Sequence, residues 1–232
     1  MITSIALAFA IGFLPALIWL FLLLQEDAPH PEPKRIIALA FLAGALSVLV
    51  ALPLEQMAQA RLTMMTSVIF AWAVIEEVVK YAAAAALILW RKWVDEPIDY
   101  VIYLIVIGLG FAAFENVLFV LSPFTGGEIM AGFLTGNLRF IGSTLLHVFA
   151  SALIGFALAF SYKKPWSFRV IATALGLVLA SSLHALFNLL IISKDGNETV
   201  AAFFFVWTGV VVVLALMEVL RYQARQLSRK PR

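Results

Sequence analysis

Apolar residues form long runs along almost the whole chain, and short polar segments separate them. A transmembrane helix needs about 20 apolar residues, because each residue rises about 1.5 Å and the hydrocarbon layer is about 30 Å thick. Each run approaches or exceeds that length, so the pattern predicts an all-α, polytopic transmembrane helix bundle of about seven spans. The predicted spans are residues 2–24, 36–54, 63–90, 98–121, 137–161, 168–193 and 199–220.

The composition agrees with a chain that lies mostly in the lipid bilayer. Hydrophobic residues make up 63% and charged residues 13%, whereas a soluble domain has about 25% charged residues. The chain has no cysteine, which excludes disulfides and thiolate metal sites, and its net charge of +2 does not indicate a nucleic-acid partner. We expect one integral-membrane domain over residues 1–232, with its motif-bearing core at about 63–193. The first run lacks a basic start, so we expect a retained helix rather than a cleaved signal peptide.

Positive charges lie mainly in alternate connections and in the C-terminal tail. Lysine and arginine occur at 34–35, 91–92, 163–169 and 221–232 and are sparse on the opposite side of the predicted bundle. Because basic residues favour the cytoplasmic side, the pattern predicts an outside N-terminus and a cytoplasmic C-terminus. Arg139 lies near the outer end of the predicted fifth span, where we expect it to anchor that span at the lipid headgroups.

Ionisable residues occur inside four of the predicted spans, at similar depths in the outer half. At about 1.5 Å per residue they lie roughly 9–15 Å from the outer ends of their spans. An ionisable side chain at the centre of a bilayer costs roughly 2.5–3.5 kcal/mol unless it faces protein, water or a partner. A shared, hydrated pocket that opens outward is the simplest account of their alignment. The residues at these depths are Glu76, Glu115, His147 and His184, and Glu77 and Lys80 follow Glu76 in the same span.

The spacing of these residues adds expectations about geometry. Glu76 and Lys80 are four residues apart on one helix face, so we expect them to form an ion pair, with Glu77 facing another partner. His184 and Asn188 share the same spacing. Asn116 has two open interpretations, a hydrogen bond between helices or a part in catalysis. Glycine and alanine at 108–113 predict a close approach of neighbouring helices beside Glu115.

Four motifs in chain order resemble those of the PrsW intramembrane proteases, in the group that includes the CAAX prenyl proteases and their Abi relatives. They are Glu-Glu-x-x-Lys at 76–80, Phe-x-x-x-Glu-Asn at 111–116, His-x-x-x-Ser at 147–151 and His-x-x-x-Asn at 184–188. Glu115 stands where CAAX-type members have histidine, which favours the PrsW type. The resemblance implies cleavage of a single-span, anti-sigma-factor-like membrane protein on the extracytoplasmic side.

Two catalytic schemes remain open at this point, and the first, which needs no cofactor, is favoured over the second. In the first, Glu76 is the general base, Lys80 orients it, and His184 with Asn188 stabilises the oxyanion. His147 then polarises the water or donates a proton, and Glu115 orients a histidine or shares the water. In the second scheme two histidines and a carboxylate hold a zinc ion, although the His-Glu-x-x-His helix is absent. The candidate ligands are Glu76, Glu115, His147 and His184.

A function of another class also fits the buried charges. Chains of glutamate, lysine and histidine occur in proton-coupled transporters and channels. Such proteins often contain repeated halves with helices broken at corresponding positions, and this sequence has no clear repeat of that kind. A structural ion pair at Glu76, Glu77 and Lys80 is the third alternative. An intramembrane peptidase accounts for the most residues.

Overall fold

The computed structural model describes residues 2–26, 31–192 and 196–228, with side chains described as far as Tyr222. This part of the chain forms eight α-helices and no strand, which confirms the all-α prediction. The helices are α1 (Ile2–Glu26), α2 (Lys34–Arg61), α3 (Met65–Leu87), α4 (Pro97–Thr125), α5 (Ile129–Ile141), α6 (Ser143–Phe160), α7 (Trp166–Ile192) and α8 (Gly196–Ser228).

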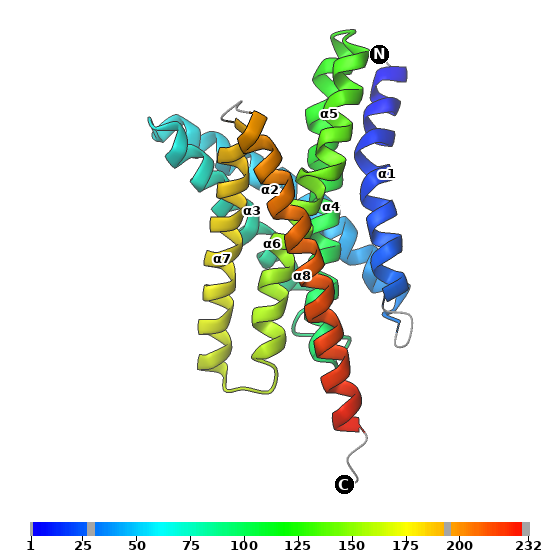
Figure 1. Ribbon diagram of the computed structural model, residues 1–232, viewed down its shortest axis with the longest axis vertical. Coiled ribbons are helices and arrows are strands. Elements are labelled where there is room, and N and C mark those ends of the chain that lie inside the picture. The colour runs from blue at the N-terminus through cyan, green and yellow to red at the C-terminus, as the bar shows by residue number, and fades with distance from the viewer. Residues whose placement is uncertain (1, 27–30, 193–195, 229–232) are drawn as a thin grey trace.

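The start of α1 and the end of α8 lie at opposite ends of the bundle (Figure 1). Six segments of the described chain are long and apolar enough to cross a membrane, and α5 and α6 together form one of them. Helix α3 is not among the six, and its middle contains Glu76, Glu77 and Lys80. With α3 as a further crossing, the chain crosses the bundle an odd number of times, which agrees with the predicted seven spans. The protein is thus a polytopic helix bundle.

The predicted fifth span differs from the structure in its form. The prediction was one helix over residues 137–161, but the helical segment begins at Ile129 and is broken at Gly142, where α5 ends and α6 begins. The prediction missed this break, although Gly142 and Ser143 form a Gly-Ser pair, which is a common site of helix kinks. The break lets the short helix α5 take a direction of its own beside α4 and α1.

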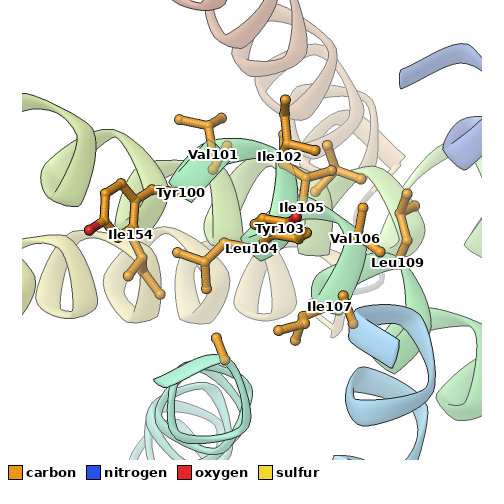
Figure 2. Close-up of a cluster of buried hydrophobic side chains, with 14 of the residues drawn as sticks. Tyr100, Val101, Ile102, Tyr103, Leu104, Ile105, Val106, Ile107, Leu109 and Ile154 are labelled. Atoms are coloured by element: carbon orange, nitrogen blue, oxygen red, sulfur yellow. The ribbon is translucent and has the colours of Figure 1, made fainter. Parts of the chain in front are cut away.

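Helix α4 is the centre of the bundle. It packs against α1, α2 and α6, and every residue from Ile98 to Ala113 is buried. A helix that is apolar on all sides is buried on all sides, and residues 100–113 have this character apart from two tyrosines. Figure 2 shows the side chains from Tyr100 to Leu109 pointing from α4 in several directions, with Ile154 of α6 beside them. The packing of this apolar half of α4 fixes the position of the residues that follow it, which include Glu115 and Asn116.

Glycines let the backbone of α2 come close to that of α4. A Cβ atom at Gly44 would overlap the carbonyl oxygen of Ile107, and one at Gly110 would overlap the carbonyl oxygen of Phe41. On the opposite side of α4, a Cβ at Gly108 would lie 2.6 Å from the hydroxyl oxygen of Ser151 on α6. The predicted close approach of helices at these glycines is confirmed.

The other end of α4 begins in a polar cluster. Glu96 and Asp99 form a capping box, in which each side chain accepts a backbone N–H of the other residue. Tyr103 donates its hydroxyl to Glu32, which lies just before α2. Burial raises the pKa of the Glu32 carboxyl above its ordinary value, although the bond from Tyr103 opposes this shift. The cluster joins the start of α4 to the chain that leads into α2.

Candidate active site

Helices α3, α4, α6 and α7 bring the predicted ionisable residues to one place. Five of these side chains are almost completely buried, namely Glu76, Glu77, Lys80, His147 and His184. Glu115 is more accessible, with 18% of its side chain exposed. The four motifs therefore meet in space, although more than 100 residues separate the first from the last. Among these six residues, Glu115 is therefore the one most exposed to solvent.

Lys80 pairs with Glu77 and not with Glu76. Its ammonium nitrogen lies 2.5 Å from Oε1 of Glu77 and 3.0 Å from Nδ1 of His147. The expected ion pair between Glu76 and Lys80 is therefore wrong. The reason is that residues three and four apart are both neighbours on a helix, and the side of Lys80 that faces α6 is the side that Glu77 occupies. The pair neutralises two buried charges at once.

Each histidine has one ring nitrogen on a carboxylate. Nδ1 of His184 lies 2.7 Å from Oε1 of Glu77, and Nε2 of His147 lies 3.0 Å from Oε2 of Glu115. Since a carboxylate accepts, each of these nitrogens is the one that carries the hydrogen. Lys80 can only donate, so its contact with Nδ1 of His147 agrees with that assignment. The two imidazole rings meet edge to face, with centroids 5.1 Å apart.

The remaining ring nitrogens face Glu76. Nδ1 of His147 lies 3.9 Å and Nε2 of His184 lies 3.8 Å from Oε2 of Glu76. That oxygen is buried and has no hydrogen-bond partner within the described residues. With the hydrogens assigned as above, the lone pairs of these two nitrogens and one carboxylate oxygen converge, and the lone pair on Nδ1 of His147 also accepts from Lys80. Three acceptors at one point attract a cation.

These three residues fit a metal ion. One ligand atom from each of Glu76, His147 and His184 lies within 4.8 Å of the others. Two histidines and a carboxylate are a known ligand set for catalytic zinc with an open position, and a histidine ligand usually donates its other N–H to a carboxylate or carbonyl. Glu77 and Glu115 supply those carboxylates. Glu115, a candidate ligand by sequence, lies behind His147 and outside the group of three.

Arg139 joins the site from α5. Its guanidinium donates through Nη2 to Oε2 of Glu115 and through Nε to Oδ1 of Asn116, the latter at 2.6 Å. Asn116 in turn donates to Oγ1 of Thr144 at 3.0 Å. The expectation that Arg139 anchors its span at the headgroups is therefore wrong, because α5 lies along α4 and directs the side chain inward. No helical spacing in the sequence signals this placement, because Gly142 breaks the helix between Arg139 and His147.

Comparison with known protein families identifies the chain. The model of the PrsW family, described as intramembrane metalloproteases, matches residues 32–217 and so includes every motif. The chain belongs to the PrsW family. It is therefore a multi-pass integral membrane protein and an intramembrane peptidase that acts on membrane proteins. The curated proteins and the solved structures contain no match to the chain.

Other residues of this PrsW protein lie at the edge of the group. Asn188 is half-buried one turn after His184, and no hydrogen bond within the described residues joins it to the histidines. Asn116 bridges α4, α5 and α6 and does not reach the imidazoles. Glu55 of α2, which the sequence reasoning missed, lies near enough to interact electrostatically with Glu76 and Glu115. Its position near the end of a span gave no signal of this placement.

Proposed function

We propose that this PrsW protein hydrolyses a peptide bond of a single-span, anti-sigma-factor-like membrane protein near the extracytoplasmic side. One observation carries the proposal: Oε2 of Glu76 is buried without a hydrogen-bond partner in the part of the chain that the structure describes, while Nδ1 of His147 and Nε2 of His184 face it at 3.9 and 3.8 Å. The outer side follows from the predicted orientation. Substrate class and side of cleavage rest on the family resemblance together with that orientation.

In this proposal Glu76, His147 and His184 hold a divalent metal ion, with zinc the best match to the ligand types. Bound there, the ion would lower the pKa of a water molecule and stabilise the negative charge that develops on the scissile carbonyl oxygen. The convergence of three acceptors favours this scheme over an oxyanion site, which needs hydrogen-bond donors. Water reaches the group from the side of Glu115.

The remaining residues keep the ligands in place. Glu77 holds the His184 ring through Nδ1, and Glu115 holds the His147 ring through Nε2. Lys80 neutralises the charge of Glu77 and so leaves that carboxylate ionised in a buried place. Lys80 also contacts the single lone pair of Nδ1 of His147, so binding of a cation at that nitrogen requires the ammonium to withdraw toward Glu77, its ion-pair partner.

The metal-free scheme uses the same geometry with a water molecule among the three acceptors. Oε2 of Glu76 then takes a proton from the water, and that proton passes to the leaving amine. Both schemes need Glu76, so replacement of Glu76 alone does not separate them.

The experiment measures metal content and cleavage on the same purified protein. A reporter with one membrane span and an extracytoplasmic tag is reconstituted with wild type, Glu76→Gln, His147→Asn and His184→Asn. We expect about one equivalent of divalent metal in wild type, its loss in the three variants, and cleavage that falls at least about 100-fold. His30→Asn changes the remaining histidine of the chain, which belongs to none of the four motifs and lies outside the described residues, and as the control it is expected to keep both metal and cleavage.

Two outcomes would contradict the proposal. Cleavage by protein stripped of metal, in the presence of chelator, would replace the metal scheme with the glutamate scheme. Undiminished cleavage by folded Glu76→Gln protein would move the peptidase site elsewhere in the chain.

A further inference from the structure

Helix α5 is a short helix whose only charged side chain points into the site. It has 13 residues, ends at Gly142, and exposes most of its apolar side chains. Its contacts are with α4, α6 and α1, and Gly132 and Gly136 let it lie close to Phe124 and Ile11. Arg139, near its end, is the one α5 residue that reaches the ionisable group.

The Arg139 guanidinium is held on three sides by α4. It donates to Glu115 and to Asn116, and its carbon Cζ lies 3.9 Å from the centroid of the Phe119 ring. The side chain of Arg139 is 15% exposed and that of Glu115 is 18% exposed. This pair therefore forms the accessible edge of an otherwise buried group.

The decisive detail is which oxygen of Glu115 is shared. Oε2 accepts from Nη2 of Arg139 and also lies 3.0 Å from Nε2 of His147. A carboxylate held by a fork-shaped guanidinium keeps its orientation, whereas a partly exposed carboxylate without this partner turns toward water. Arg139 thus acts on His147 through Glu115, without touching the imidazole.

We propose that Arg139 is a positioning residue, which makes docking of α5 a requirement for a correctly oriented His147. This inference rests on the proposed function, since it concerns how one ligand of the same site is held. It adds that the reactive arrangement depends on a helix outside the four motif-bearing ones. A PrsW protein whose α5 has moved away from α4 then keeps Glu76 and His184 in place and loses the orientation of His147.

The first test replaces Arg139 and measures kcat and KM for the single-span reporter. Arg139→Ala is expected to lower kcat about 10- to 100-fold, the usual effect of removing a partner that orients a ligand, with a smaller change in KM. Arg139→Lys keeps the charge but not the fork, so it should recover part of that loss. Cleavage is expressed per folded molecule, measured by the thermal unfolding transition in detergent.

Arg169 offers a matched control at the other end of the bundle. Like Arg139 it donates to a neighbouring side chain, here the hydroxyl of Tyr100, and its guanidinium lies over an aromatic ring, that of Trp90. Arg169→Ala therefore removes a comparable set of contacts far from the site, and kcat per folded molecule should stay unchanged. If Arg139→Ala and Arg169→Ala behave alike in kcat, the positioning role is overturned.

A double-mutant comparison tests the route through Glu115. Glu115→Gln should lower kcat by itself, and adding Arg139→Ala should then lower it by no more than about 3-fold further, because both changes break one chain of contacts. Losses that simply multiply would mean that Arg139 acts independently of Glu115, and the inference would fail.

A spectroscopic readout separates this inference from the proposed function. The chain has three histidines, so ¹⁵N-histidine labelling gives a spectrum with few signals. Wild type should show His147 with its hydrogen on Nε2, and Arg139→Ala should change the signals of His147 while those of His184 remain. Unchanged His147 signals overturn the inference even if wild type cleaves the reporter. If wild type fails to cleave but the His147 change is seen, only the proposed function is lost.

Discussion

The two halves of helix α4 use opposite means to hold their neighbours. From Val101 to Leu109 every side chain is buried, and all but Tyr103 are apolar or glycine. From Phe111 to Asn116 the same helix carries Glu115 and Asn116, whose contacts are hydrogen bonds and an ion pair. In the first half the attraction is summed over many small van der Waals contacts. In the second half each group depends on one or two named partners.

This difference determines how each half responds to change. A buried apolar side chain that is shortened leaves a cavity, and the rest of the packing persists. A buried charge whose partner is removed is left uncompensated. The resulting loss of stability disturbs the neighbouring groups of the site as well. Substitutions on the apolar side should therefore lower stability alone, whereas substitutions on the polar side should lower activity beyond any loss of stability.

The largest effect is expected from Lys80→Met. Removing the ammonium leaves the Glu77 carboxylate buried and unpaired, which should cost about 3–5 kcal/mol of unfolding free energy. The double variant Lys80→Met with Glu77→Gln removes both charges and should recover most of that stability, while cleavage stays lost because His184 no longer has its carboxylate. Unfolding in detergent gives the first quantity and reporter cleavage the second. If the double variant is as unstable as the single one, the Lys80–Glu77 ion pair does not determine the stability of the site beside the polar half of α4.

Leu104→Ala tests the apolar half. Leu104 is completely buried on α4, so truncation should cost about 2–5 kcal/mol through the cavity that it leaves. Cleavage per folded molecule should remain at the wild-type level, measured at a temperature where both proteins are folded. Leu175→Ala, on the exposed face of α7, is the control and should change neither quantity. A selective loss of cleavage in Leu104→Ala would remove the contrast between the two halves.

Gly110→Ala tests the boundary between the halves. The added Cβ would overlap the carbonyl oxygen of Phe41, which belongs to the α2 backbone and cannot turn aside. Separating the two helices should cost about 1–3 kcal/mol, as overpacking usually does. Gly196→Ala meets no atom within 4 Å and is the control. Equal stability of the two variants would mean that α2 adjusts freely and does not fix the register of α4.

The smallest effect is expected from Glu32→Gln, at the far end of α4 from the site. Burial raises the pKa of Glu32 above 4.5 in the folded protein, so the folded state holds the proton more tightly than the unfolded state. The stabilisation is complete below pH 4.5 and is lost as pH rises through the folded pKa. The Tm of wild type should therefore fall relative to that of Glu32→Gln as pH rises. Glu128→Gln, which removes an exposed carboxylate, controls for net charge, and a constant difference at all pH values would contradict the assignment.

Much of the fold could be predicted from the sequence because the bilayer demands it. A run of about 20 apolar residues has few alternatives to a spanning helix, and buried charges in separate spans have reason to meet. The meeting of Glu76, His147 and His184 was therefore predictable from depth alone. The glycines of α4 likewise indicated a close approach, since small residues are what helix contacts in membranes use.

The predictions that the structure contradicts concern contacts that residue spacing along one helix does not determine. Glu76 and Glu77 are both within reach of Lys80, and only the positions of α6 and α7 select Glu77. The break at Gly142 was missed because the apolar run as a whole is long enough for one span, and the Gly-Ser pair at 142–143 permits a kink without requiring one. Arg139 was assigned to the headgroups because a basic residue near a span end usually lies there, and its true partners belong to another helix.

The order of the charges in α3 also bears on how the protein enters its membrane. Glu77 and Lys80 are three residues apart in the same helix, so their pair forms as soon as that helix does, before any other segment is made. At about 2.5–3.5 kcal/mol for each ionised side chain at mid-span, this internal neutralisation removes most of the penalty for partitioning α3 from the translocon into lipid. Of the three charged residues of α3, Glu76 then lacks its neighbours until α6 and α7 are made. The surroundings of Glu76 are therefore complete only after synthesis of the C-terminal half.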